Sequence, residues 1–192
     1  MFERSQHLAR EVELAAMQIN SINSAIRNQA REDDWTPGVR LDEIVDECLV
    51  ILSLSFTDIE VKMSRADRVA LTCSRSRIGQ VVMNLLKNAA DAIHSRSEHG
   101  TVLITTAYQG NDVVLQIEDS GPGFELDDTA KIFDVFYTTK EVGKGTGLGL
   151  TIVARVVEEH GGSIQVDKSV EIGGAKFSIY LPREAEIKGV SK

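Results

Sequence analysis

Apolar residues recur at steps of three and four in four stretches of the chain, and this spacing predicts four helices. The first stretch is a narrow stripe with the heptad spacing of a coiled-coil seam: Leu8, Val12, Ala15, Ile19, Ile22 and Ile26. One helix cannot bury such a stripe by itself, so we expect it to pack on a partner helix or to fold back on its own domain. The other predicted helices span residues 41–52, 74–93 and 150–159.

Between these helices, apolar and polar residues alternate in the manner of half-buried strands. The alternation predicts two short strands, then a hairpin that turns at residues 109–111, and finally two more strands. Their ranges are 59–63, 69–73, 101–108, 112–118, 163–167 and 175–181. Helices that alternate with strand pairs indicate an α/β fold of the α+β two-layer sandwich type.

A charged segment with proline and glycine, residues 31–38, interrupts the helical pattern and predicts a hinge. We place the domain boundary there. Residues 1–34 then form the first helix and the hinge, residues 35–186 form the main domain, and residues 187–192 form a tail.

Composition and charge exclude several function classes. The 192 residues are 42% hydrophobic and 26% charged, which excludes a disordered or fibrous chain. A net charge of −8 argues against a nucleic-acid partner. With no membrane-spanning apolar run and no signal-peptide core at the N-terminus, we expect a cytoplasmic chain without membrane contact. Cys48 and Cys73 lie in apolar runs without metal-ligand spacing, and we expect them to be reduced core residues.

Two asparagines stand in the predicted helix 74–93, where they lower helix propensity. Asn84, Asn88 and Asp91 lie at i, i+4 and i+7, so they share one stripe of the helix. Lys87 lies off this stripe. An asparagine carbonyl is a suitable neutral ligand for Mg²⁺, an ion that takes its other ligands from water and phosphates. Taken alone, the stripe is more typical of a solvated helix face.

A carboxylate and two glycines follow the predicted strand 112–118. Asp119 could accept the exocyclic amine of an adenine, and Gly121 and Gly123 allow the backbone to turn tightly beside it. The same residues also suit an ordinary turn.

A glycine-rich segment, residues 143–149, runs directly into the predicted helix 150–159. Glycines let backbone N–H groups converge on phosphate oxygens, and the helix N-terminus adds a partial positive charge. The spacing differs from that of a Walker loop, and the segment lacks the βαβ context of a dinucleotide fold.

Taken in order, NLLKNAADAI, DSGPGF, IFDVFYTTK and GKGTGLGL resemble the N box, first glycine box, phenylalanine box and second glycine box of the GHKL ATP-binding superfamily. The chain is most similar to the catalytic and ATP-binding domain of two-component sensor histidine kinases, and EEHGGSIQV and GGAKFSIYLP fit the same pattern. The resemblance spans about residues 41–182. It implies a GHKL (Bergerat) fold, with helices on one face of a mixed sheet, that binds ATP or ADP with Mg²⁺.

The resemblance also implies roles for particular residues. Asp119 would anchor adenine above a pocket floor of Gly121 and Gly123, and Asn88 would ligate Mg²⁺ with Asn84 as its catalytic companion. The remaining implied nucleotide contacts are Asp91, Phe133, Phe136 and Lys140, then Gly145, Thr146, Gly147, Leu148 and Gly149. Among these, the two phenylalanines and Lys140 would belong to a lid over the nucleotide, roughly residues 124–144.

One position distinguishes phosphotransfer from hydrolysis. Hydrolytic members of the superfamily carry a glutamate four residues before the Mg²⁺ asparagine, where it acts as general base. This chain has Asn84 there, and an amide cannot accept a proton at neutral pH. The resemblance therefore implies a protein-histidine kinase rather than an ATPase.

The phosphoacceptor is harder to find. His7 is followed by Leu8 rather than an acidic residue, and no proline follows in the acceptor pattern. His94 and His99 lie in a polar loop, and His160 precedes two glycines as a helix-cap residue. We therefore expect residues 8–30 to resemble the second helix of a dimerisation hairpin, with the acceptor histidine outside this chain.

The implied partners are a histidine-bearing dimerisation helix, from the same or a second chain, and a response-regulator receiver domain. The full-length protein would be a homodimer. Two alternatives stay open: a pseudokinase that binds nucleotide as a signal, and a serine-directed kinase of the anti-sigma type.

Overall fold

The computed structural model describes residues 35–97, 99–124, 131–135, 137 and 147–184. The predicted N-terminal helix and the tail at 187–192 lie outside these described residues.

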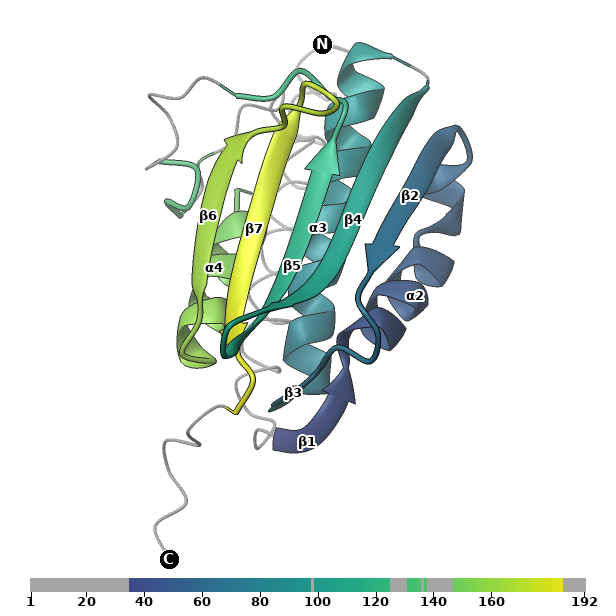
Figure 1. Cartoon of the computed structure of the whole chain (residues 1–192). Coiled ribbons are helices and arrows are strands. Elements are labelled where there is room, and N and C mark those ends of the chain that lie inside the picture. The colour runs from purple at the N-terminus through teal and green to yellow at the C-terminus, as the bar shows by residue number, and fades with distance from the viewer. Residues whose placement is uncertain (1–34, 98, 125–130, 136, 138–146, 185–192) are drawn as a thin grey trace, which may run out of the picture.

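A five-stranded mixed sheet forms one layer of the fold (Figure 1). Its order is β2-β4-β5-β7-β6; β2 and β4 are parallel, and the other neighbours are antiparallel. The strands are β2 (Ile59–Arg65), β4 (Gly100–Gln109), β5 (Asp112–Asp119), β6 (Ser163–Lys168) and β7 (Ala175–Pro182). The predicted hairpin is confirmed, and Gly110 takes the positive φ of 62° that its two-residue turn requires.

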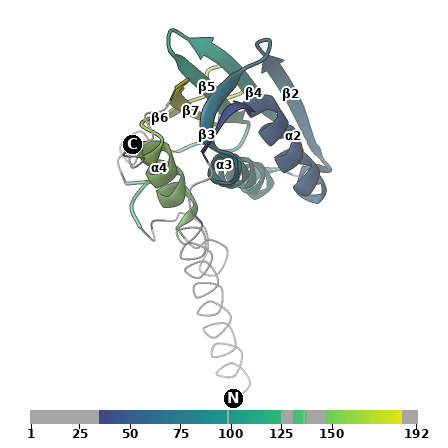
Figure 2. The same ribbon diagram turned by 90° about the horizontal axis from the view of Figure 1, so that it is seen from below.

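Three helices form the second layer: α2 (Leu41–Ile51), α3 (Arg75–Arg96) and α4 (Gly149–Glu159). They lie side by side on one face of the sheet, with α3 in the middle (Figure 2). The helical period explains this arrangement, because the buried residues of α3 repeat along one side of that helix: Ile78, Val81, Val82, Leu85, Leu86, Ala89, Ala90 and Ile93. They pack on the inner residues of the central strands, among them Ile104, Leu115, Ile117 and Ile179. The predicted two-layer α/β sandwich is confirmed.

The first described residues correct the predicted hinge. Its last four residues belong to strand β1 (Trp35–Arg40), which pairs antiparallel with β3 (Ala70–Ser74) in a second, two-stranded sheet. Pro37 and Gly38 are accommodated because the register shifts between Thr36 and Val39, with Gly38 at a φ of 71°. The two short strands expected at 59–63 and 69–73 therefore enter different sheets, since β2 pairs with β4 and β3 pairs with β1.

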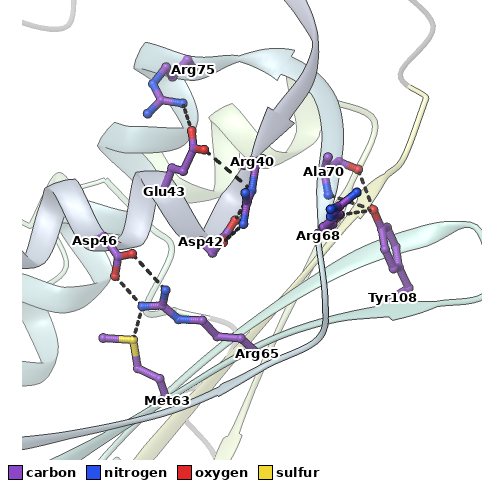
Figure 3. A network of polar contacts seen from close by, with 10 residues as sticks. All are labelled: Arg40, Asp42, Glu43, Asp46, Met63, Arg65, Arg68, Ala70, Arg75 and Tyr108. Carbon is purple, nitrogen blue, oxygen red and sulfur yellow. Dashed lines mark hydrogen bonds and ion pairs between the residues drawn. The ribbon is translucent and has the colours of Figure 1, made fainter.

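Arginines from β1, β2 and α3 form ion pairs with acidic residues on the exposed side of α2 (Figure 3). The side chain of Arg40 donates to Asp42 at 3.2 Å, Arg65 donates to Asp46 at 2.9 Å, and Arg75 donates to Glu47 at 2.6 Å. Nearby, Tyr108 on β4 accepts a hydrogen bond from the Ala70 N–H at 2.8 Å and donates to the Arg68 carbonyl at 2.9 Å. These contacts join β1, β3 and α2 to the main sheet.

No helix among the described residues is both long and apolar enough to cross a membrane. Cys48 and Cys73 are free and buried, as predicted. Burial raises the pKa of the Cys48 thiol to about 11 and that of Cys73 to about 12, so both stay protonated at neutral pH.

Candidate functional site

Asp119 is a buried carboxylate at the end of β5, on the helix-covered face of the sheet. Only 3% of the residue is exposed, and its Oδ1 accepts hydrogen bonds from the backbone N–H of Gly121 at 2.9 Å and of Ala175 at 3.4 Å. Burial raises the pKa of Asp119, and the two N–H donors offset part of that rise. Asp119 is therefore a rigid acceptor whose charge is balanced by dipoles, with no ion pair to it among the described residues.

Glycines allow the backbone to close around this carboxylate. A Cβ on Gly121 would lie 2.8 Å from the Cβ of Ala92 on α3. A Cβ on Gly174, in the turn before β7, would lie 2.2 Å from the Asp119 carbonyl oxygen. Gly123 has a φ of 72° and packs against Gly174. Only glycine fits at these positions, so the loop after β5 and the turn before β7 together form the wall behind Asp119.

One and two helical turns before Ala92 on α3, the amides of Asn88 and Asn84 face the start of α4. A Cβ on Gly149 would lie 3.8 Å from Oδ1 of Asn84 and 4.0 Å from Nδ2 of Asn88. The Asn84 Nδ2 group is buried without a hydrogen-bond partner among the described residues. A buried donor without a partner is costly, so this amide is a candidate position for a ligand acceptor.

The residues around this stripe follow the predicted helical spacing. Lys87 is exposed, in agreement with its position off the stripe, and Asp91 is partly buried one turn beyond Asn88. Helix α3 thus lies between the two glycine segments, with Asn84 and Asn88 opposite Gly149 and with Ala92 opposite Gly121.

The glycine-rich segment that we predict to lie beside phosphates is described in part. Gly147 has a φ of 63°, Leu148 is the N-cap of α4, and Gly149 is its first residue. Phe133 packs against the hydrophobic core, and its carbonyl accepts a hydrogen bond from the Thr151 hydroxyl at 3.0 Å. Four predicted contacts lie outside the described residues: Phe136, Lys140, Gly145 and Thr146.

His160 is the C-cap of α4, as predicted, and it is buried. Its Nε2 accepts a hydrogen bond from the Ser74 N–H at 3.2 Å, which places the ring proton on Nδ1, 2.7 Å from the Val156 carbonyl. Its ring also lies 4.4 Å from that of Trp35. His94 and His99 are exposed, and His7 lies outside the described residues.

Sequence reasoning missed the residues that support Asp119 from the β6–β7 turn. Gly174 and Ala175 contact the carboxylate directly, and Ser169 hydrogen-bonds to the neighbouring Glu118. The signal available was the glycine pair at 173–174 before a strand, which predicts a close backbone approach but not the approaching partner.

Comparison with known proteins agrees with this geometry. Residues 73–185 match the family described as histidine kinase-, DNA gyrase B-, and HSP90-like ATPase. The chain belongs to this family.

Sensor histidine kinases are among the similar proteins. The chain is 33% identical over 183 residues to the sensor histidine kinase ZraS of Salmonella typhi, a match that covers 93% of this chain and 38% of ZraS. Its fold matches the catalytic domain of histidine kinase ThkA with a TM-score of 0.70 and 30% identity, over 79% of this chain and 97% of that domain. ThkA in complex with the response regulator TrrA also matches, with a TM-score of 0.70 and 25% identity, over 88% of this chain and 48% of that one. The described fold is thus an ATP-binding catalytic domain of the histidine-kinase type, and the chain spans about two fifths of the length of ZraS.

Proposed function

We propose that this chain binds Mg–ATP and transfers the γ-phosphoryl group to a histidine on a dimerisation helix, for relay to a response regulator. One observation carries the proposal. A buried carboxylate, Asp119, and a pair of amides, Asn84 and Asn88, lie along one path beside α3, and the backbone of a glycine closely approaches each end of it.

At one end of this path, Asp119 would recognise the base. Both of its hydrogen bonds to the protein backbone end on Oδ1. Its other oxygen, Oδ2, would accept the 6-amino group of adenine, and Gly121 and Gly123 would border the ring.

At the other end, the start of α4 would receive the phosphates. Backbone N–H groups at residues 147–149 and the positive end of the helix favour an anion there. The unpartnered Asn84 Nδ2 is a donor for a phosphate oxygen, and the side-chain oxygen of Asn88 is suited to Mg²⁺. When bound, Mg²⁺ would neutralise negative charge on the triphosphate.

The amide at Asn84 favours transfer over hydrolysis, because it orients a phosphate without deprotonating water. The main contribution of the protein is then to position the triphosphate and to exclude other nucleophiles.

The partners follow from the chemistry and from the relatives. The acceptor would be a histidine on a dimerisation helix, as part of a homodimeric kinase, since no histidine of this chain lies in an acceptor motif. The complex of the related ThkA with TrrA supports a receiver domain as the next acceptor. We place the domain in the cytoplasm, where ATP is available.

The experiment supplies the chain with γ-labelled ATP, Mg²⁺ and a separate histidine-bearing hairpin from a sensor kinase. We expect acid-labile phosphate on the hairpin and none on the chain alone. Asn88→Ala should reduce transfer at least about tenfold, since it removes the proposed Mg²⁺ ligand, whereas Lys87→Ala on the exposed side of the same helix should not.

The alternatives give different results. Nucleotide binding without any transfer would indicate a pseudokinase, and acid-stable phosphate on a serine substrate would indicate a serine kinase. Acid-labile label on the chain alone that disappears in His7→Gln would identify His7 as the acceptor.

A further inference from the structure

The turn between β6 and β7, residues 169–174, is a surface turn with a buried serine at its start. Only 2% of Ser169 is exposed, although the next residue, Val170, is fully exposed. The Ser169 hydroxyl donates a hydrogen bond to Oε2 of Glu118 at 2.7 Å and accepts one from the Ile172 N–H at 3.1 Å. The hydroxyl therefore ties the turn both to itself and to strand β5.

Glu118 is the residue before Asp119, and the two side chains lie on opposite faces of the sheet. Glu118 is 8% exposed, and its Oε1 lies 3.5 Å from the ammonium of Lys176, its cross-strand neighbour on β7. The Lys176 ammonium lies beside the carboxylate, so Glu118 is a fixed acceptor for Ser169.

The other end of the turn reaches Asp119 itself. Ser169 N–H donates to the Gly174 carbonyl at 2.8 Å, which closes the turn. The Gly174 backbone packs on Asp119 so closely that a Cβ would lie 2.5 Å from its Oδ1. The next residue, Ala175, donates its N–H to that same Oδ1 at 3.4 Å. A continuous set of contacts therefore leads from Glu118, through Ser169 and Gly174, back to Asp119.

The last contact in this set is the most sensitive to displacement. At 3.4 Å, the Ala175–Asp119 hydrogen bond is near the upper limit for such a bond, so a small shift of the turn would break it. Asp119 would then keep one backbone donor, Gly121. Its side chain could rotate away from the orientation in which Oδ2 faces the base.

We propose that Ser169 and Glu118 are positioning residues for Asp119, and that their hydrogen bond sets how strongly the site prefers adenine over a purine without a 6-amino group. This inference rests on the proposed function, in which Asp119 accepts that amino group. Neither residue touches the nucleotide; both act through the turn.

The test measures dissociation constants of the full chain for Mg–ATP and Mg–ITP by calorimetry, because ITP carries a 6-oxo group where ATP carries the amine. Ser169→Ala should weaken ATP binding about three- to tenfold and leave ITP binding within about twofold, so that the ratio of the two affinities falls. Glu118→Ala removes the acceptor of the same hydrogen bond and should lower the ratio of the two affinities by a similar factor. Glu118→Gln, which keeps an acceptor oxygen for Ser169, should retain most of the preference.

Ser178→Ala is the matched control. Ser178 is equally buried, at 2% exposure, lies on the same face of the sheet as Glu118, and accepts a hydrogen bond from Gln116 at 3.2 Å. It has no hydrogen bond to the 169–174 turn, so its loss should cost stability without changing the ATP to ITP ratio. A residue that only supported the fold would behave as Ser178 does.

The outcomes separate this inference from the proposed function. If Asp119→Asn loses the preference for ATP while Ser169→Ala and Glu118→Ala both keep it, the positioning role is wrong and the adenine site stands. If Asp119→Asn also keeps the preference, the adenine site itself is wrong. Should Ser169→Ala fail to fold, the Glu118 pair of variants decides the question by the same ratio.

Discussion

The acidic residues of α2 and Asp119 at the end of β5 show two opposite ways of holding negative charge. On α2, Asp42, Glu43 and Asp46 are paired with arginines from other elements (Figure 3). Asp119 is buried, and its described contacts are backbone N–H groups. Accordingly, the hydrogen bond from Arg40 lowers the pKa of Asp42, whereas burial raises the pKa of Asp119.

The difference separates a structural contact from the binding site that we propose. Ion pairs at the surface satisfy both partners and contribute only about 0–1 kcal/mol each. A carboxylate buried without a counter-charge lowers stability, and a fold retains it where a ligand completes its hydrogen bonding. Asp119 and the buried Asn84 amide, which has no hydrogen-bond partner among the described residues, are therefore our candidates for ligand contacts. The α2 carboxylates are not.

The largest expected effect is the loss of nucleotide affinity in Asp119→Asn. Replacing a charged acceptor by an amide should cost about 1.5–3 kcal/mol, or ten- to a hundredfold in the ATP dissociation constant. Asp42→Asn is the control and should bind ATP as the parent chain does. Calorimetry that finds equal affinities in a folded Asp119→Asn variant would remove the distinction between the two regions.

The second expected effect is an opposite pH dependence of stability without nucleotide. Asp119 has a raised pKa in the folded state, so its contribution to stability is present at acid pH and is lost as pH rises through that pKa. Asp42 has a lowered pKa, so its contribution is present at neutral pH and is lost as pH falls through that pKa.

Asp119→Asn should therefore melt at a higher temperature than the parent chain at pH 7, with the gain shrinking toward pH 4. Asp42→Asn should melt at a lower temperature at pH 7, with the deficit shrinking toward acid pH. Thermal scans across this range check both signs, and a gain for Asp42→Asn at pH 7 would contradict the assignment of its ion pair.

The smallest expected effect concerns the ion pairs of α2 themselves. Arg65→Gln removes the partner of Asp46 and should cost about 0.2–1 kcal/mol, because both side chains are partly exposed to solvent. The cost should fall when the salt concentration rises from 0.1 to about 1 M, where screening is stronger. Chemical denaturation with urea at both salt concentrations measures it, and a cost that is independent of salt would indicate lost packing instead.

The elements and the candidate ligands could be predicted from the sequence because both are local patterns. Helical spacing predicted α3 and its Asn84–Asn88 stripe, alternation predicted the β4–β5 hairpin, and Gly121 and Gly123 marked the turn beside Asp119. The predicted hinge, residues 31–38, overlaps the first four residues of β1. Pro37 and Gly38 carry a turn signal, and β1 accommodates them as a register shift.

The tertiary structure alone decided which distant residues meet. Asp119 and its donor Ala175 are 56 residues apart, and Glu118 and Ser169 are 51 apart, so no local period relates them. The separation of β2 and β3 into two sheets also depends on long-range pairing, since either strand has the alternation to pair with several partners. The sequence by itself determined which residue types were available at each element end. The burial of Asp119, the burial of the Asn84 amide and the hydrogen bond from Ser169 to Glu118 arise only when packing brings those ends together, because desolvation and hydrogen-bond geometry are properties of the assembled site.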